Sequence, residues 1–174
     1  MKAIESLGTF QRRGDNLDVR YERFFPRPPE TVWSALTDPA RLADWMGNCR
    51  LEPHAGGGVN LMQDRPRPMT GKILVWEPPQ VLEYSWSNAD APNSVVRFEL
   101  AREGGGTRMI FTHKAMPYIS SGLMLPGWHF LFARLGSLLA GDAKPESKQT
   151  WLELQGIYVA HYQLDGVLLE HPAI

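Results

Sequence analysis

Residues 25–45 constrain the fold of this chain more than any other stretch. Prolines end the alternating segment that precedes them, because proline has no N–H to donate to a strand pairing. Pro29 suits the first turn of a helix, with Glu30 beside it at the positive helix end. Asp38 before Pro39 begins a second short helix, since proline restricts the residue that precedes it. The stretch therefore predicts a strand followed by two short helices.

Alternation of apolar and polar residues predicts strands on both sides of these helices. A short strand is expected at 7–12, and a half-buried strand begins at Leu17. Further strands are expected at 49–53, 58–63, 70–77, 81–87, 94–102 and 107–114. In the last three, one face of each strand is apolar and the other polar. The pattern favours an antiparallel sheet with one covered and one solvated face.

A single apolar helix, ended by Gly141, is expected to cover that sheet. Its apolar positions, at helical spacing, are Trp128, Leu131, Phe132, Leu135, Leu138 and Leu139. Beyond a linker, apolar residues from Trp151 onward predict another helix, and a loose tail is expected from Leu168. The fold class is α+β. We expect a ligand-binding domain at 1–143 and a C-terminal helical extension at 144–174 that packs on it.

Composition and charge argue against several classes of protein. A chain of 174 residues is long enough for one domain with a full core. The net charge is −1 and Lys and Arg are dispersed, so the broad basic face of a nucleic-acid-binding protein is missing. No apolar run approaches the ~20 residues needed to cross a bilayer, so no membrane insertion is expected. Cys49 is the only cysteine and the N-terminus resembles no signal peptide, which favours a reduced, cytoplasmic setting.

No motif points to catalysis, a metal or a cofactor. The glycine triplets at 56–58 and 104–106 lie between predicted strands and lack the Lys-Ser or Lys-Thr of a P-loop, so we interpret them as hairpin turns. None of the five histidines has a second ligand at a recognised metal spacing. Ser120 and Ser121 form no nucleophile elbow. We therefore assign no catalytic residue, no metal and no cofactor.

The positive signal is a set of large side chains predicted to point inward. A single helix across a strongly curved sheet leaves volume, and aromatic side chains are expected to line it. His113 continues the inward face and is a candidate polar anchor, as is the Tyr84 hydroxyl. A histidine that is merely hydrogen-bonded in the core is the alternative reading of His113. The predicted ligand-binding residues are Trp45, Tyr84, Trp86, Phe98, Met109, Phe111, His113, Trp128 and Phe132.

Several segments, taken in order, resemble the SRPBCC superfamily of START-like, helix-grip proteins. More closely, the chain resembles the bacterial branch related to the C-terminal domain of the activator of the heat-shock-protein-90 ATPase. The resemblance covers about residues 7–141. It rests on Arg20–Pro26, Pro28–Pro39, Ala43–Trp45, Gly56–Val59, Gly71–Leu74, Glu77–Pro79, Leu82–Trp86, Gly106–His113 and Gly127–Trp128.

The resemblance implies a curved antiparallel sheet wrapped around a long C-terminal helix, with a ligand cavity between them. Relatives of this architecture bind lipids, sterols or aromatic natural products. The favoured hypothesis is therefore a non-enzymatic protein that binds a small hydrophobic or aromatic molecule. Whether residues 144–174 cover the cavity entrance or form a homodimer surface stays open.

Two other hypotheses use the same architecture. A cyclase- or hydrolase-type enzyme would need a general acid or base in the pocket, and His113 is the best candidate. A regulator of a chaperone ATPase is less favoured, because the eukaryotic activator carries a separate domain ahead of this one. The residues that precede Leu17 are too few to supply such a domain.

Overall fold

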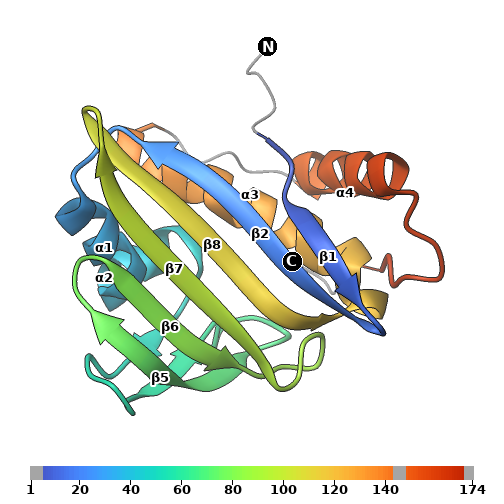
Figure 1. Cartoon of the computed structure of the whole chain (residues 1–174), viewed down its shortest axis with the longest axis horizontal. Coiled ribbons are helices and arrows are strands. Elements are labelled where there is room, and N and C mark those ends of the chain that lie inside the picture. Colours follow the sequence, from blue (N-terminus) through green and yellow to red (C-terminus); the bar gives the residue numbers. More distant parts are fainter. Residues whose placement is uncertain (1–5, 143–147, 171–174) are drawn as a thin grey trace.

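The computed structural model describes residues 6–142 and 148–170, which form one curved antiparallel sheet with helices on one side (Figure 1). The eight strands follow the order β1-β2-β8-β7-β6-β5-β4-β3. Their bounds are β1 Thr9–Arg13, β2 Asn16–Phe25, β3 Arg50–Leu51, β4 Gly58–Leu61, β5 Met69–Glu77, β6 Val81–Trp86, β7 Ser94–Glu103 and β8 Gly106–Pro117. The helices are α1 Pro29–Thr37, α2 Pro39–Trp45, η1 Tyr118–Ser120, α3 Ser121–Ala140 and α4 Lys148–Tyr162. The predicted α+β helix-grip architecture is confirmed.

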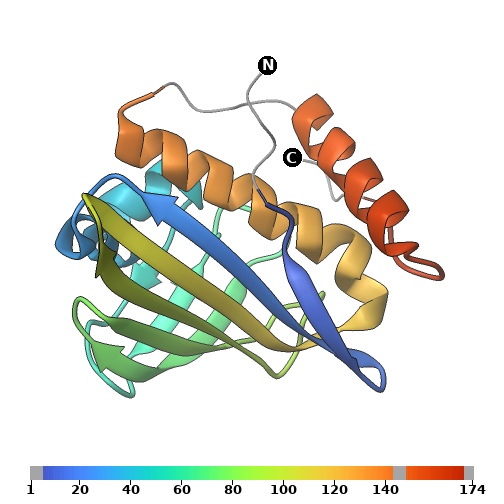
Figure 2. The same ribbon diagram turned by 45° about the horizontal axis from the view of Figure 1, so that its top comes forward.

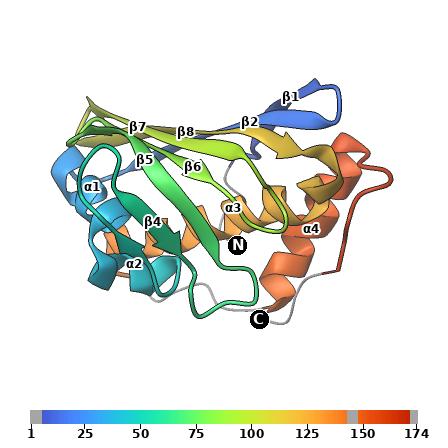
Figure 3. The ribbon, with the colours of Figure 1, turned by 90° about the horizontal axis from the view of Figure 1, so that it is seen from below.

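The sheet bends around α3, which crosses its concave face (Figures 2 and 3). Register shifts between β2 and β8 and between β5 and β6 contribute to this bend, because an extra residue in one strand increases its twist. In β8 the extra residue lies near Ala115, whose φ of 60° is unusual for a non-glycine residue. The Asp18 carboxylate accepts a hydrogen bond from the Ala115 N–H at 3.2 Å and so holds the bulge.

The two short helices form as the sequence predicts. Pro29 stands at the first position of α1, and Asp38 lies between the helices in extended conformation. The Asp38 carboxylate accepts a hydrogen bond from the Ala40 N–H at 3.0 Å, which caps the start of α2. Gly141 ends α3 in the left-handed conformation, at a φ of 77°, as predicted.

The helix α3 begins seven residues before the predicted start at Trp128, because it continues through Pro126. Proline has no N–H, so the carbonyl of Gly122, one turn earlier, receives no bond from within the helix. The Gln155 side-chain amide of α4 donates to this carbonyl at 2.8 Å instead. A partner from another helix thus replaces the missing bond, and the sequence pattern around Pro126 gives no sign of it.

The helix α4 lies beside α3, with the start of the described chain passing near both (Figure 2). The Tyr158 hydroxyl accepts a hydrogen bond from the Gly8 N–H at 2.8 Å and lies 2.9 Å from His129 Nδ1. The Tyr162 hydroxyl donates to the Gly8 carbonyl at 2.7 Å. We call Gly8, His129, Gln155, Tyr158 and Tyr162 the α4 junction.

The C-terminal segment after α4 is more ordered than the loose tail expected from Leu168. The Leu168 N–H donates to the Ile119 carbonyl at 2.8 Å, and the Leu169 carbonyl accepts from Gln155 at 3.1 Å. A Cβ on Gly122 would lie 2.5 Å from the Leu168 carbonyl oxygen, so the segment packs directly on α3. The predicted linker falls at 143–147, outside the described residues. The division into a domain at 1–143 and an extension at 144–174 stays a prediction.

The span Tyr118–Ala140 is long and apolar enough to cross a membrane, by length and composition alone. This corrects the expectation that no apolar run has the required length, since the helix starts earlier than predicted. Half of the window is buried inside the protein, as in the core helix of a soluble fold.

Candidate functional site

The predicted ligand-binding residues all lie in the interior and are at most 3% exposed. Most of them come from the inward faces of β6, β7 and β8 and from the middle of α3. We call Tyr84, Trp86, Phe98, Phe111, His113, Trp128 and Phe132 the central cluster, because ring contacts join them in one group. The structure therefore brings together seven residues that are spread over 49 positions of the sequence.

The rings of the central cluster are closely spaced. The ring centroids of Phe111 and Trp128 are 4.4 Å apart, and those of Phe98 and Phe111 are 4.9 Å apart. Trp128 and Trp86 are separated by 5.1 Å. These are contact distances for aromatic pairs. A guest molecule must therefore lie beside these rings or displace one of them, since it cannot lie between them as they stand.

Trp45 and Met109 occupy different surroundings from the cluster. Trp45 ends α2, and its indole N–H donates to the Ala35 carbonyl at 2.9 Å, which ties α2 to α1. Met109 is buried on β8 and pairs with Leu100 across the strands. No ring contact joins either residue to the central cluster among the contacts that the described residues make. Their assignment to a ligand site stays a prediction.

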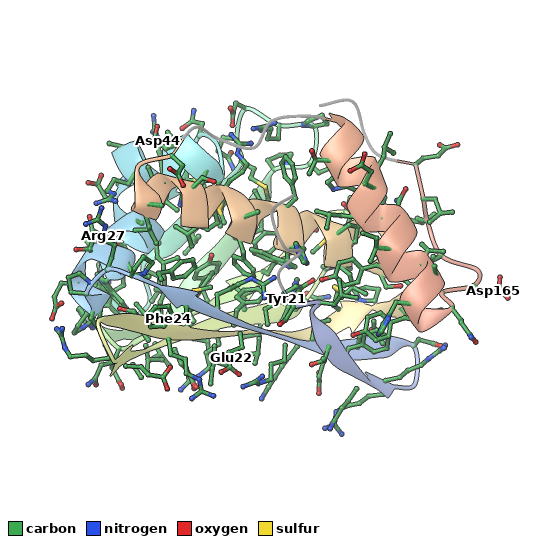
Figure 4. The ribbon with its side chains drawn as sticks, turned by 90° about the horizontal axis from the view of Figure 1, so that it is seen from above. Tyr21, Glu22, Phe24, Arg27, Asp44 and Asp165 are labelled. Atoms are coloured by element: carbon green, nitrogen blue, oxygen red, sulfur yellow. The ribbon has the colours of Figure 1, made fainter. Side chains whose placement is uncertain are left out.

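Tyr21 belongs to the same interior, although we did not predict it as a site residue. Its ring centroid lies 5.4 Å from that of Phe132 and 6.1 Å from that of Phe111. Its hydroxyl donates to the Leu125 carbonyl of α3 at 2.6 Å. Figure 4 shows Tyr21 between the sheet and the helix, whereas the neighbouring Glu22 lies on the outer side. The alternation that starts at Leu17 was the signal that could have identified it.

His113 connects the cluster to a short chain of hydrogen bonds. The Trp128 indole N–H donates to His113 Nδ1 at 3.0 Å. His113 Nε2 lies 2.8 Å from the Ser94 hydroxyl oxygen. Because Nδ1 accepts a hydrogen bond, the proton of a neutral imidazole must be on Nε2, which then donates to Ser94. The Ser94 hydroxyl can in turn donate to the Ala91 carbonyl at 2.9 Å.

Burial keeps His113 uncharged. The side chain is fully buried, and this lowers its pKa from 6.5 to about 3. Both ring nitrogens already have protein partners. His113 therefore holds Trp128 and Ser94 in place, and neither nitrogen is free to exchange a proton with a substrate. Ser94 is the member of this chain that sequence reasoning missed, and nothing in its sequence surroundings marks it.

Trp86 differs from the other tryptophan of the cluster. Its side chain is 2% exposed, yet no atom of the described residues accepts a hydrogen bond from its indole Nε1. The ring contacts Trp128 and His113, at centroid distances of 5.1 and 5.6 Å. Most buried N–H groups in proteins have a partner, so the unpaired Trp86 N–H is an exception that needs an explanation.

Tyr84 is buried on β6, in contact with Phe98 at a centroid distance of 6.2 Å. Burial, and to a smaller extent the nearby Cys49, raises the pKa of the Tyr84 hydroxyl far above its ordinary value. Burial also raises the pKa of the Cys49 thiol to about 11, so the thiol stays protonated and weakly reactive.

The described residues form a surface depression away from the central cluster but no metal site. The depression is lined by Ser6, Leu7, Thr9, Arg20 and Glu22, at the β1–β2 side of the sheet and not at the central cluster. Within residues 6–142 and 148–170, no three His, Cys, Asp or Glu side chains gather in a way that could hold a metal ion.

Comparison with solved structures agrees with this architecture. The crystal structure of CalU16 from Micromonospora echinospora superposes with a TM-score of 0.74 and 29% identity, over 88% of this chain and 95% of that one. The solution structure of the protein encoded by BPP1335 from Bordetella parapertussis gives a TM-score of 0.71 and 26% identity, over 98% of this chain and 97% of that one. DynU16, a protein in the dynemicin biosynthetic locus, gives a TM-score of 0.66 over 75% of this chain and 49% of that one. At 23% identity, DynU16 supports the fold alone.

No curated protein matches the sequence. A family model does match, over residues 26–140, and it describes Activator of Hsp90 ATPase homolog 1-like proteins. This match runs from the end of β2 to the last residue of α3, so it includes every residue of the central cluster. It supports the SRPBCC-type resemblance drawn from the sequence. The chain therefore belongs to the family of Activator of Hsp90 ATPase homolog 1-like proteins.

Proposed function

We propose that this protein binds a small hydrophobic molecule, aromatic or lipid-like, between the sheet and α3. The observation that carries the proposal is the central cluster, a group of buried aromatic rings without a charged side chain among its members. Its histidine is neutral at physiological pH, because burial lowers the pKa to about 3. Apolar walls with few polar groups are typical of small-molecule sites.

A thermal-shift screen of aromatic metabolites and lipids tests the proposal. A ligand that binds the folded state alone raises its stability by about 2.7 kcal/mol at a concentration 100 times Kd, which is readily seen as a higher Tm. Binding beside Trp86 and Trp128 should also change tryptophan fluorescence. If no apolar compound raises Tm or alters the fluorescence, the binding proposal fails.

An enzyme that uses His113 as general acid or base is the weaker candidate. A catalytic base must reach the proton that it takes from the substrate. Both His113 nitrogens are within 3.0 Å of Trp128 or Ser94, so a substrate would first have to displace one of them. Turnover that His113→Ala abolishes, with ligand binding retained, would restore this candidate.

Regulation of a chaperone ATPase is suggested by the family description alone. Recovery of a chaperone with the tagged protein, and a change in its ATPase rate, would be needed to support it. A reduced, cytoplasmic setting is part of the proposal and fits a chain whose single cysteine is buried. Sedimentation of the purified protein would decide whether it forms a homodimer.

A further inference from the structure

The indole of Trp86 is an oriented hydrogen-bond donor in an interior lined mostly by apolar side chains. Its N–H lies in the plane of a ring that Trp128 and His113 hold at contact distance. A hydroxyl group can rotate to find a partner, but an indole N–H points in one direction once the ring is fixed. The position of the ring therefore fixes where an acceptor atom must lie.

The neighbouring polar groups do not supply that acceptor. His113 Nδ1 accepts from Trp128, and His113 Nε2 is the donor to Ser94. The Ser94 hydroxyl has its own contacts with His113 and with the Ala91 carbonyl. Trp128 offers only a donor, which His113 already uses. The Ser94 hydroxyl also lies 3.2 Å from the Trp86 backbone carbonyl, but no described residue accepts a hydrogen bond from the Trp86 indole, so a bound molecule would supply the acceptor.

A donor left unpaired in the interior is unfavourable, because the N–H loses its hydrogen bonds to water on folding. The same donor favours a guest that carries an acceptor over an equally large guest without one. A site built to donate a hydrogen bond discriminates strongly against analogues that lack the matching group. Specificity would thus come from one atom, and apolar burial would supply most of the affinity.

We propose that Trp86 is the polar recognition point of this site, where its Nε1–H donates to an oxygen acceptor on a neutral, flat aromatic ligand. The acceptor is a carbonyl, ether or phenol oxygen. A neutral ligand is favoured because the rings that touch Trp86 belong to Trp128 and to the uncharged His113. This inference rests on the proposed binding function and assigns the chemistry of its ligand.

Fluorenone and fluorene form a suitable probe pair, since they share one flat tricyclic shape and differ in a single carbonyl oxygen. The indole N–H signals are observed by 15N-edited NMR, and the Trp86 signal is the one missing from Trp86→Phe. We expect fluorenone to move this signal downfield, as a new hydrogen bond does, and fluorene to leave it without such a shift. A Trp86 signal that stays in place while fluorenone is bound overturns the inference, including the case in which water already satisfies the donor.

Affinities measured by fluorescence give a second readout. Trp86→Phe should lower the ratio of fluorenone to fluorene affinity by about three- to tenfold, the worth of one hydrogen bond. The matched control is Trp33→Phe, which makes the same change at a buried tryptophan of α1 and should keep the wild-type ratio.

The outcomes separate the two proposals. If both probes bind and Trp86→Phe leaves their ratio unchanged, the binding function stands and the role of Trp86 is wrong. If neither probe binds to wild-type protein, the ligand chemistry assigned here is wrong, and the thermal-shift screen decides separately whether the binding function stands. Should Trp86→Phe fold poorly, the Trp86 signal is assigned by triple-resonance NMR of the wild-type protein, and the comparison of the two probes on that signal still decides the question.

Discussion

The central cluster and the α4 junction are both buried against α3, and each contains a histidine beside aromatic residues. They differ in how their polar groups are satisfied. At the junction the Tyr158 hydroxyl, the Gly8 backbone and the Gln155 amide all have partners. In the cluster the Trp86 N–H has no acceptor among the described residues.

This difference separates a structural contact from a candidate binding site. These polar groups of the junction hold α4, the start of the described chain and α3 together, so they are already occupied and not available to a ligand. The cluster combines apolar area with the unpaired indole N–H of Trp86, and few polar groups among apolar walls are typical of small-molecule sites. Buried polar groups are therefore informative mainly through the partners that they lack.

The largest expected effect is at the centre of the cluster. Phe111→Ala removes a ring that contacts Phe98, Trp128 and Phe132, and it should lower the free energy of unfolding by about 3–5 kcal/mol. Urea denaturation measures this. Phe24→Ala is the control, since this side chain is 54% exposed, and it should change stability by less than about 0.5 kcal/mol. Equal effects of the two changes would show that the cluster adds nothing to stability.

Acid should destabilise the protein through its buried histidines. Burial, with a smaller effect from the charge of Arg23, lowers the pKa of His129 from 6.5 to about 4. Below pH 6.5 the unfolded chain binds a proton that the folded chain takes up only near pH 4. His129 therefore leaves the free energy of unfolding unchanged above pH 6.5. As the pH falls from 6.5 towards 4, it lowers this free energy by on the order of 3 kcal/mol.

Urea denaturation at a series of pH values, with His129→Gln beside wild type, measures this decline. The variant should lose less stability between pH 6.5 and pH 4 than wild type, although His113 still contributes to its decline. The exposed His54 provides the matched control, and His54→Gln should decline as wild type does. An unchanged pH dependence in His129→Gln would contradict the assignment.

A smaller effect is expected at the junction. Gln155→Ala leaves the Gly122 carbonyl, freed by Pro126, without its donor, which should cost about 1–3 kcal/mol. Gln80→Ala, at an exposed turn, is the control and should be near neutral. Hydrogen exchange of the first turns of α3 should rise in Gln155→Ala alone. If it does not, the bond from α4 is dispensable for this part of the helix.

The smallest expected effect is the difference in stability between variants of Trp86 and Trp128, the two tryptophans whose rings touch. Trp128→Phe removes a hydrogen bond and leaves His113 Nδ1 without its donor, whereas Trp86→Phe removes a donor that has no partner. Since both changes delete the same atoms, Trp128→Phe should be the less stable variant by about 1–2 kcal/mol. Thermal unfolding of the two proteins checks this. Equal stabilities would imply that the Trp86 N–H is already bonded.

Much of the fold follows from local pattern. The alternation in β6, β7 and β8 predicts both the strands and the face that is buried, because side chains of a strand point alternately to its two sides. Asp38 and Pro39 mark the boundary between α1 and α2 through short-range backbone chemistry. Gly141 ends α3 for the same kind of reason. These signals lie within a few residues of the element that they specify.

Local sequence patterns thus predict the order of the elements, their inward faces and the aromatic residues that would meet between them. Which polar atoms find partners is seen only once the chain is folded. Gln155 satisfies the carbonyl that Pro126 leaves free, and His113 uses both nitrogens while Trp86 Nε1 finds no acceptor among the described residues. Such pairings depend on positions set to within a few tenths of an ångström across residues distant in the chain, and local sequence pattern carries no information about them.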